Sequence, residues 1–275
     1  MKLPFVLISL CISQIALSQN QISDFKKMNL KGKVISINEK ETKSPSVIAD
    51  GGQFNSRIEN TFYTFNKAGF ITEKKNSTNN NFNSKEKLYY NSLNQVSKIE
   101  NYDSEDHLKD YGNYETEYDK NGEISKTFDG TTSSNYKSEV VTKLDNKLIT
   151  EYSFEGNAYV KTAEKLKNKK GEIIEHRLYS HDKLHIETFY SYNDKGYQSK
   201  YIFKEYWNGK VHLNSQQFVY NKNNDIVKII SLDKDNNTLN EENFSYEYDK
   251  QGNWISKQTH GDYIIRTGRD IKYGK

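Results

Sequence analysis

The sequence has 275 residues, of which 28% are charged and 13% aromatic, and its formal net charge is +3. This length suits one large β domain or a repeat array. Acidic and basic residues are interspersed along the chain, so the clustered basic surface of a nucleic-acid-binding protein is not indicated. The 21 tyrosines argue against a disordered chain, because disordered segments are poor in aromatic residues.

The first residues follow the order of a secretory signal peptide. Lys2 precedes an apolar stretch from Leu3 to Leu17, and the small residue Ser18 stands before Gln19. The stretch is shorter than the ~20 apolar residues of a membrane-spanning helix. We expect residues 1–18 to be removed by cleavage near Ser18, leaving a secreted or periplasmic protein with no membrane span in the mature chain. Cys11, the only cysteine, would leave with the signal peptide, so no disulfide is expected.

Residues 19–275 are predicted to form a single β-hairpin repeat domain. It starts with a short helix over Ile22–Met28, a first strand over Leu30–Ile37 and a loop over Glu39–Phe54. No later segment keeps a helical spacing of apolar residues. Pro45 is the only proline after residue 18, and a near absence of proline favours uninterrupted strand ladders.

A turn motif then recurs eight times. Its best copies read aromatic–x–aromatic–Asn/Asp–x–x–Gly, as in Tyr190–Gly196 and Tyr246–Gly252. The turn openers are Asn66, Asn91, Asp119, Asp145, Asn168, Asn193, Asn221 and Asp249, at spacings of 25, 28, 26, 23, 25, 28 and 28 residues. Such regular self-similarity indicates a repeat architecture.

Each position of the motif has a mechanical reason. The opening Asn or Asp accepts hydrogen bonds from the backbone ahead of it, and the Gly or Asn three residues later can adopt a positive φ. Such a turn closes a β-hairpin. The aromatic residues one and three positions before the opener share a sheet face, because side chains alternate along a strand.

The motif therefore predicts an all-β fold of roughly sixteen strands in an antiparallel meander. The expected form is an elongated sheet, curled or partly closed, with its tyrosine face inside and its charged face outside. Full closure of the sheet on itself is left open. Variable polar loops are predicted at Asn76–Asn83, Asp129–Asn135 and Asp233–Thr238, and an Asn-Gly turn at Asn208-Gly209.

The copy Tyr246-Glu247-Tyr248-Asp249-Lys250-Gln251-Gly252 resembles the tyrosine–aspartate (YD, Rhs-like) repeats of bacterial proteins, and the resemblance covers about residues 60–260. It implies sheets of repeated hairpins, and carbohydrate binding has been attached to such repeats. This sequence departs from that family in its longer period and in having Asn where most copies of the motif have Asp. It also has no C-terminal core or toxin segment.

No catalytic, cofactor or metal site is predicted. The six histidines are interpreted as exposed loop residues without metal-ligand companions; they are His107, His176, His181, His185, His212 and His260. Asp233–Asn237 starts like a calcium loop, but Thr238 and Phe244 stand where Gly and Glu are required, so a hairpin loop is preferred. The sequence has no Gly-x-Ser-x-Gly elbow and no dinucleotide or phosphate-binding glycine motif.

Two tryptophans remain as candidates for stacking on a sugar ring. Trp254 is interpreted as filling the apolar position that follows the turn, whereas Trp207 stands at a predicted hairpin tip. The leading hypothesis is a non-catalytic binding or interaction protein of the cell envelope, with a carbohydrate or another envelope protein as its partner. A structural or encapsulating module is the alternative, and a hydrolase is the third reading.

Overall fold

The computed structural model describes residues 23–45, 57–118, 124–131, 137–145, 147–155, 158–260 and 263–274. They form eighteen β-strands and one short helix, so the all-β prediction is confirmed. Helix α1 (Asp24–Lys27) lies within the predicted Ile22–Met28, and the side chain of Ser23 caps its N-terminus. Within these ranges no helix is long and apolar enough to cross a membrane. The predicted signal peptide lies outside them.

The strands are β1 (Val34–Pro45), β2 (Arg57–Phe65), β3 (Ile71–Thr78), β4 (Asn81–Tyr90), β5 (Val96–Tyr102), β6 (Leu108–Tyr118), β7 (Ile124–Thr131), β8 (Lys137–Asp145), β9 (Leu148–Glu155), β10 (Ala158–Lys167), β11 (Ile173–Ser180), β12 (Lys183–Tyr192), β13 (Gln198–Trp207), β14 (Lys210–Tyr220), β15 (Ile226–Leu232), β16 (Thr238–Tyr248), β17 (Trp254–His260) and β18 (Tyr263–Tyr273).

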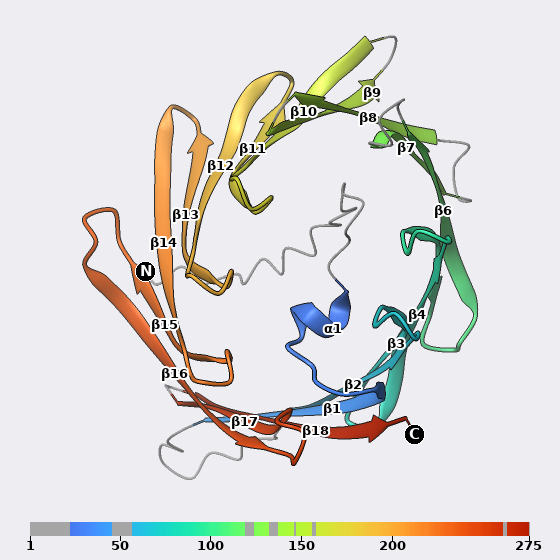
Figure 1. Ribbon diagram of the computed structural model, residues 1–275, viewed down its shortest axis with the longest axis vertical. Coiled ribbons are helices and arrows are strands. Elements are labelled where there is room, and N and C mark those ends of the chain that lie inside the picture. Colours follow the sequence, from blue (N-terminus) through green and yellow to red (C-terminus); the bar gives the residue numbers. More distant parts are fainter. Residues whose placement is uncertain are drawn as a thin grey trace.

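Strand order follows chain order, as the meander predicts. Each strand pairs antiparallel with the next, and β18 pairs with β1 over its whole length, from Val34 opposite Tyr273 to Pro45 opposite Tyr263. The hydrogen-bonded ladder therefore returns to its first strand, and the strands form the ring seen in Figure 1. Eighteen strands are present among the described residues, against roughly sixteen predicted.

Three loop predictions are wrong in the part that the structure describes, because polar sequence continues there as strand. β1 begins at Val34 and runs through residues 39–45, which were expected to be a loop; residues 46–54 of that loop lie outside the described ranges. β3 and β4 fill most of Asn76–Asn83 and leave a two-residue turn. β7 includes residues 129–131 of the predicted loop Asp129–Asn135, and the rest of it is not described.

The turn chemistry is confirmed at six motif copies. The opener's Oδ1 accepts hydrogen bonds from the backbone N–H groups two and four residues ahead, as Asp249 does from Gln251 and Asn253 at 2.9 Å each. The fourth turn residue has a positive φ, for example 81° at Gly252. The six turns of this geometry are 66–70, 91–95, 168–172, 193–197, 221–225 and 249–253.

The two other motif copies differ or are not described. Asp145 pairs directly with Leu148, so the ladder continues to the opener itself, unlike in the six copies above. Asp119 lies outside the described residues. Because consecutive antiparallel strands alternate in direction, the turns of the motif gather at one end of the ring, which we call the motif end.

The opposite end of the ring carries turns that the motif did not predict. The turns 103–107 and 233–237 repeat the opener chemistry through Asp103 and Asp233, whose Oδ1 atoms each accept two backbone hydrogen bonds. Residues 79–80, 181–182 and 208–209 have positive φ at both positions, as two-residue hairpin turns require. The predicted Asn208-Gly209 turn is thus confirmed.

The inside of the ring is lined by the aromatic residues of the motif. α1 lies inside the ring in Figure 1, and its Phe25 ring contacts that of Phe65 at a centroid distance of 4.9 Å. Alternate residues share a face, so the residues one and three positions before each opener face inward. We call this surface the inner wall; its members include Tyr63, Phe65, Leu88, Tyr90, Tyr190, Tyr192, Phe218, Tyr220, Tyr246 and Tyr248. The prediction of an inward tyrosine face is correct.

Candidate functional site

Tyrosine hydroxyls join four pairs of neighbouring hairpins at the motif end. Each donates to a backbone carbonyl five residues after the opener of the preceding turn. The four pairs, each at 2.6 Å, are Tyr90–Ile71, Tyr192–Ile173, Tyr220–Gln198 and Tyr246–Ile226. Burial raises the pKa of all four tyrosines, so their hydroxyls remain protonated donors at neutral pH. The inner wall is therefore held in a fixed geometry at the motif end.

The N-terminal segment, residues 23–33, docks on this end of the ring. Asp24 Oδ2 accepts a hydrogen bond from Ile71 N at 2.8 Å, and Phe25 N donates to Gly69 O at 3.0 Å. A Cβ at Gly69 would stand 2.8 Å from the Phe25 ring. The turn therefore needs glycine both for its positive φ and for the close approach of Phe25.

The same segment then contacts the turns 221–225 and 249–253, and we call the space between these two turns the occupied recess. Asn29 Nδ2 donates to Asn223 O at 2.8 Å and to Asp225 Oδ1 at 3.1 Å. Lys31 Nζ donates to Gly252 O at 2.8 Å. The hairpin turns thus bind a polypeptide through a carbonyl, a carboxylate and a second carbonyl.

Asn253 holds the backbone of the docked segment. Its Oδ1 accepts from Lys31 N at 2.7 Å, and its Nδ2 donates to Lys31 O at 2.8 Å and to the Tyr273 hydroxyl at 2.7 Å. The side chain of Asn253 is 2% exposed. One amide side chain therefore satisfies both backbone groups of one residue, as a neighbouring strand would.

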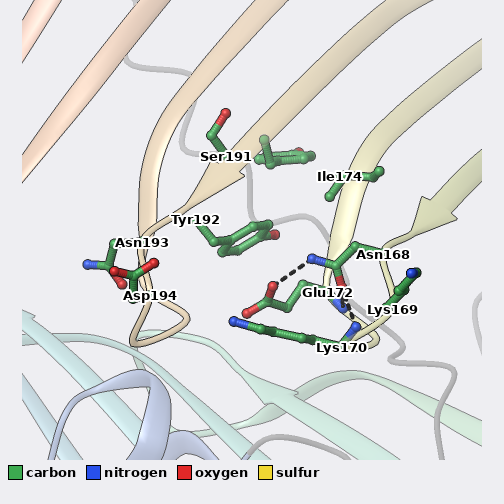
Figure 2. A pocket seen from close by; sticks show the side chains of 10 residues that line it. Asn168, Lys169, Lys170, Glu172, Ile174, Ser191, Tyr192, Asn193 and Asp194 are labelled. Carbon is green, nitrogen blue, oxygen red and sulfur yellow. Dashed lines mark hydrogen bonds between the residues drawn. The ribbon is translucent and has the colours of Figure 1, made fainter.

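A pocket of about 370 Å³ lies two hairpins away on the same inner wall. It opens between the turns 168–172 and 193–197, and we call it the open recess. It is lined by Asn168, Lys169, Lys170, Glu172, Ile174, Tyr190, Ser191, Tyr192, Asn193 and Asp194. Figure 2 shows Tyr192 between the two turns, with Glu172 and Lys170 on one side and Asp194 on the other.

The side chains of the open recess offer aromatic rings, amides and charges of both signs. Asn168 Nδ2 donates to Glu172 Oε2 at 2.7 Å, which fixes the carboxylate at the edge of the recess. Burial raises the pKa of Tyr192 to about 12, with smaller contributions from Tyr190 and the Glu172 charge. Burial likewise raises the pKa of Tyr190. The recess therefore suits a ligand rich in hydrogen-bonding groups.

A second inward cluster surrounds Arg269. Its Nε donates to Glu39 Oε2 at 2.9 Å, and its guanidinium carbon lies 3.4 Å from the centroid of the Trp254 ring. Burial lowers the pKa of Arg269, whose side chain is 7% exposed. Its Nη1 is buried without a hydrogen-bond partner within the described residues. Because the group is enclosed, we interpret this cluster as structural, and Trp254 packs in the wall as predicted.

The outer face of β4–β6 carries a polar ladder instead of a site. Glu100 accepts hydrogen bonds from Lys98 Nζ at 2.7 Å, Tyr89 at 2.7 Å and Tyr102 at 2.9 Å. These bonds, that of Lys98 first, lower the pKa of Glu100 to about 2. The carboxylate is thus stabilised in its charged form by cross-strand neighbours.

The histidines do not form a metal site within the described ranges, where no three His, Cys, Asp or Glu side chains could hold an ion. His181 lies in a two-residue turn, and the ring of His185 contacts that of Trp207 at 5.9 Å. The prediction that the histidines are exposed loop residues is wrong for four of them, because His176, His185, His212 and His260 lie in strands. His176 is also buried: it lies in β11 at 8% exposure opposite Thr188, and burial lowers its pKa. The others, His107, His212 and His260, lie in the turn 103–107, in β14 and in β17.

Asp233 and Trp207 lie at the opposite end of the ring. Both Asp233 oxygens are used within its turn, by backbone groups and by Asn237 Nδ2 at 3.0 Å, which agrees with the hairpin interpretation of Asp233–Asn237. Trp207 is 58% exposed. A shallow pocket of about 480 Å³ lies nearby on β14, lined by residues that include Val211 and Leu239.

The open recess was not predicted as a site from the sequence. The turns at Asn168 and Asn193 were both recognised, and a meander places consecutive motif turns side by side. The adjacency of these two turns was the signal in the sequence from which a recess between them could have been predicted. The docking of residues 23–33 had no such signal, because Lys31 and Asn253 are 222 positions apart.

No protein-family model and no curated protein matches the sequence. Among solved structures, the chain is similar to a porin-like protein from Bacteroides uniformis, with 11% identity, a TM-score of 0.41, and coverage of 88% of this chain and 98% of that one. It is also similar to a chain of the TcdB2-TccC3-Cdc42 complex, with 10% identity, a TM-score of 0.34, and coverage of 88% and 16%. The Tc holotoxin pore of Photorhabdus luminescens has 10% identity, a TM-score of 0.31, and coverage of 83% and 16%. With every TM-score below 0.5, the proposals below rest on the contacts of this chain.

Proposed function

We propose that the protein is an exported, non-catalytic binding protein of the cell envelope, and that the open recess on its inner wall is the binding site. The observation that carries this is the composition of the recess. Two tyrosine rings stand beside amide and charged side chains between two rigid hairpin turns. Aromatic faces with a few placed polar groups are typical of ligand-binding pockets. A carbohydrate or a polypeptide fits this chemistry.

We expect binding without turnover. The described lining residues include no histidine or cysteine to activate a nucleophile. The carboxylate of Glu172 is engaged by Asn168. A hydrolase is therefore the least favoured reading, and exported binding proteins of this kind need only a rigid scaffold with a shaped surface.

Calorimetric titration of the full chain tests the proposal. Soluble neutral polysaccharides and peptides would be the two ligand classes, and reducing-end release would be followed in parallel. Binding of either class, weakened at least about tenfold by Tyr190→Ala and without product release, supports the proposal; tenfold corresponds to about 1.4 kcal/mol. Val219→Ala on the outer face is the matched control. Product release, or binding that Tyr190→Ala leaves unchanged, contradicts it.

A structural or encapsulating module is the second candidate. One observation favours it: the inner wall already binds residues 23–33 of the chain itself. Under this reading the ring exists to enclose polypeptide, and no soluble ligand would bind. The absence of binding in both ligand classes would select this candidate.

A further inference from the structure

The occupied recess shows what a gap between two motif turns can bind. The residues that accept hydrogen bonds in it are the third and fifth residues of one turn, Asn223 and Asp225, and the fourth residue of the next turn, Gly252. They receive hydrogen bonds from a side-chain amide and an ammonium group of residues 23–33. The recess is therefore an acceptor surface for donors carried on a polypeptide.

The open recess has the same kinds of acceptor at the corresponding turn positions: the backbone carbonyl of the third residue, the carboxylate of the fifth and the carbonyl of the glycine. Lys170 and Glu172 are the third and fifth residues of its first turn, and Gly196 is the fourth residue of its second. A Cβ at Gly196 would stand 3.0 Å from Glu172 Oε1, whereas a Cβ at Gly252 would stand 3.4 Å from Lys31 Nζ. The Glu172 carboxylate therefore lies against the second turn, at the place where the docked ammonium group lies in the occupied recess. The two recesses thus share a backbone carbonyl, a carboxylate and a glycine carbonyl in the same order.

The spacing of the turns is also maintained around the ring. Lys195 Nζ donates to Asn224 Oδ1 at 3.1 Å, which ties the second turn of the open recess to the first turn of the occupied one. Tyr192 and Tyr220 anchor successive hairpins through hydrogen bonds of the same length. The two recesses differ in how they could hold a ligand backbone: Tyr197 takes the place of Asn253, so the clamp on the ligand backbone is missing.

We propose that the open recess binds a polypeptide segment that carries side-chain amide and ammonium donors, of the kind that residues 23–33 supply to the occupied recess. This deepens the proposed function, on which it rests, by naming the ligand class. Binding is weaker than in the occupied recess because no side chain replaces the two backbone hydrogen bonds of Asn253. The acidic acceptor Glu172 favours a donor-rich partner over an anionic one.

A synthetic peptide with the sequence of residues 23–33, SDFKKMNLKGK, is the probe. It would carry a fluorophore and be titrated into the full chain, whose own segment fills the occupied recess. The expected result is saturable one-to-one binding. Glu172→Gln should weaken it about fivefold to tenfold, the loss of one charge-assisted hydrogen bond. A peptide with alanine in place of its asparagine should lose affinity by a similar factor. No saturable binding would overturn the proposal.

Photo-crosslinking separates the open recess from exchange at the occupied one. A peptide with a benzophenone group next to its asparagine should label residues 168–172 or 190–194. Labelling confined to the turns 221–225 and 249–253 would show displacement of the chain's own segment and overturn the proposal. If polysaccharides bind through Tyr190 while the peptide does not, this inference fails and the proposed function stands. If neither binds, both fail.

Discussion

Replacing Asn253 by alanine is expected to release the N-terminal segment from the motif end and to lower the free energy of unfolding. The side chain makes three hydrogen bonds, two to the backbone of Lys31 and one to the Tyr273 hydroxyl, and it is 2% exposed. A hydrogen bond contributes about 0.5–1.5 kcal/mol net, so the loss should be roughly 2–4 kcal/mol.

Two measurements locate this loss. Urea denaturation gives the change in the free energy of unfolding, and hydrogen exchange reports the segment itself through the amides of Phe25 and Leu30. These amides donate to Gly69 O at 3.0 Å and to Phe25 O at 2.8 Å. Both should exchange faster in the variant, because local opening needs fewer contacts to break.

Asn237 supplies the matched control. It occupies the same fifth position of a turn, but at the opposite end and exposed, and its side chain bonds only Asp233 in the structure described. Asn237→Ala should cost less than about 0.5 kcal/mol, as surface substitutions usually do. Equal urea midpoints for the two variants would refute the role assigned to Asn253.

Gly252→Val should destabilise the fold by about 1–3 kcal/mol relative to Gln251→Val, because Gly252 has a φ of 81° that a β-branched residue disfavours; equal melting temperatures would contradict this. An NMR titration should find the Glu100 pKa at about 2, and Lys98→Met should raise it by removing the hydrogen bond that lowers it most. The contribution of Glu100 to stability is thus present above its ordinary pKa of 4.5 and lost as the pH falls through about 2; a titration near 4.5 in the wild type would exclude the ladder. N-terminal sequencing of the exported protein should begin near Gln19, and an uncleaved chain would disprove the signal peptide.

The turns were predictable because their chemistry is local. An Asn or Asp opener followed three residues later by a positive-φ residue determines a hairpin without distant help, as at Asn66 and Gly69. Residues 39–45 were missed because their alternating charges read as a loop. Glu39 is stabilised in a strand by Arg269, which is 230 positions away and has no pattern in common with it.

The part of the candidate site that depends on local sequence was predictable, and the part that depends on long-range packing was not. The tyrosines that line the inner wall follow from the period-two spacing before each opener. The recess between two turns follows only once neighbouring hairpins are known to pack, and the docking of residues 23–33 depends on one buried amide, Asn253. Such single long-range contacts leave no periodic trace in a sequence.

The pairing of β1 with β18 has a consequence for synthesis on the ribosome. Hairpins from β2 onward can form as they emerge, but β1 keeps an unpaired edge until β18 is made, more than 200 residues later. Contacts of such high sequence separation form slowly. Unpaired strand edges invite association between chains, so the nascent protein stays vulnerable to aggregation until translation nears its end. An exported chain that is kept unfolded until it has crossed the membrane would avoid this interval.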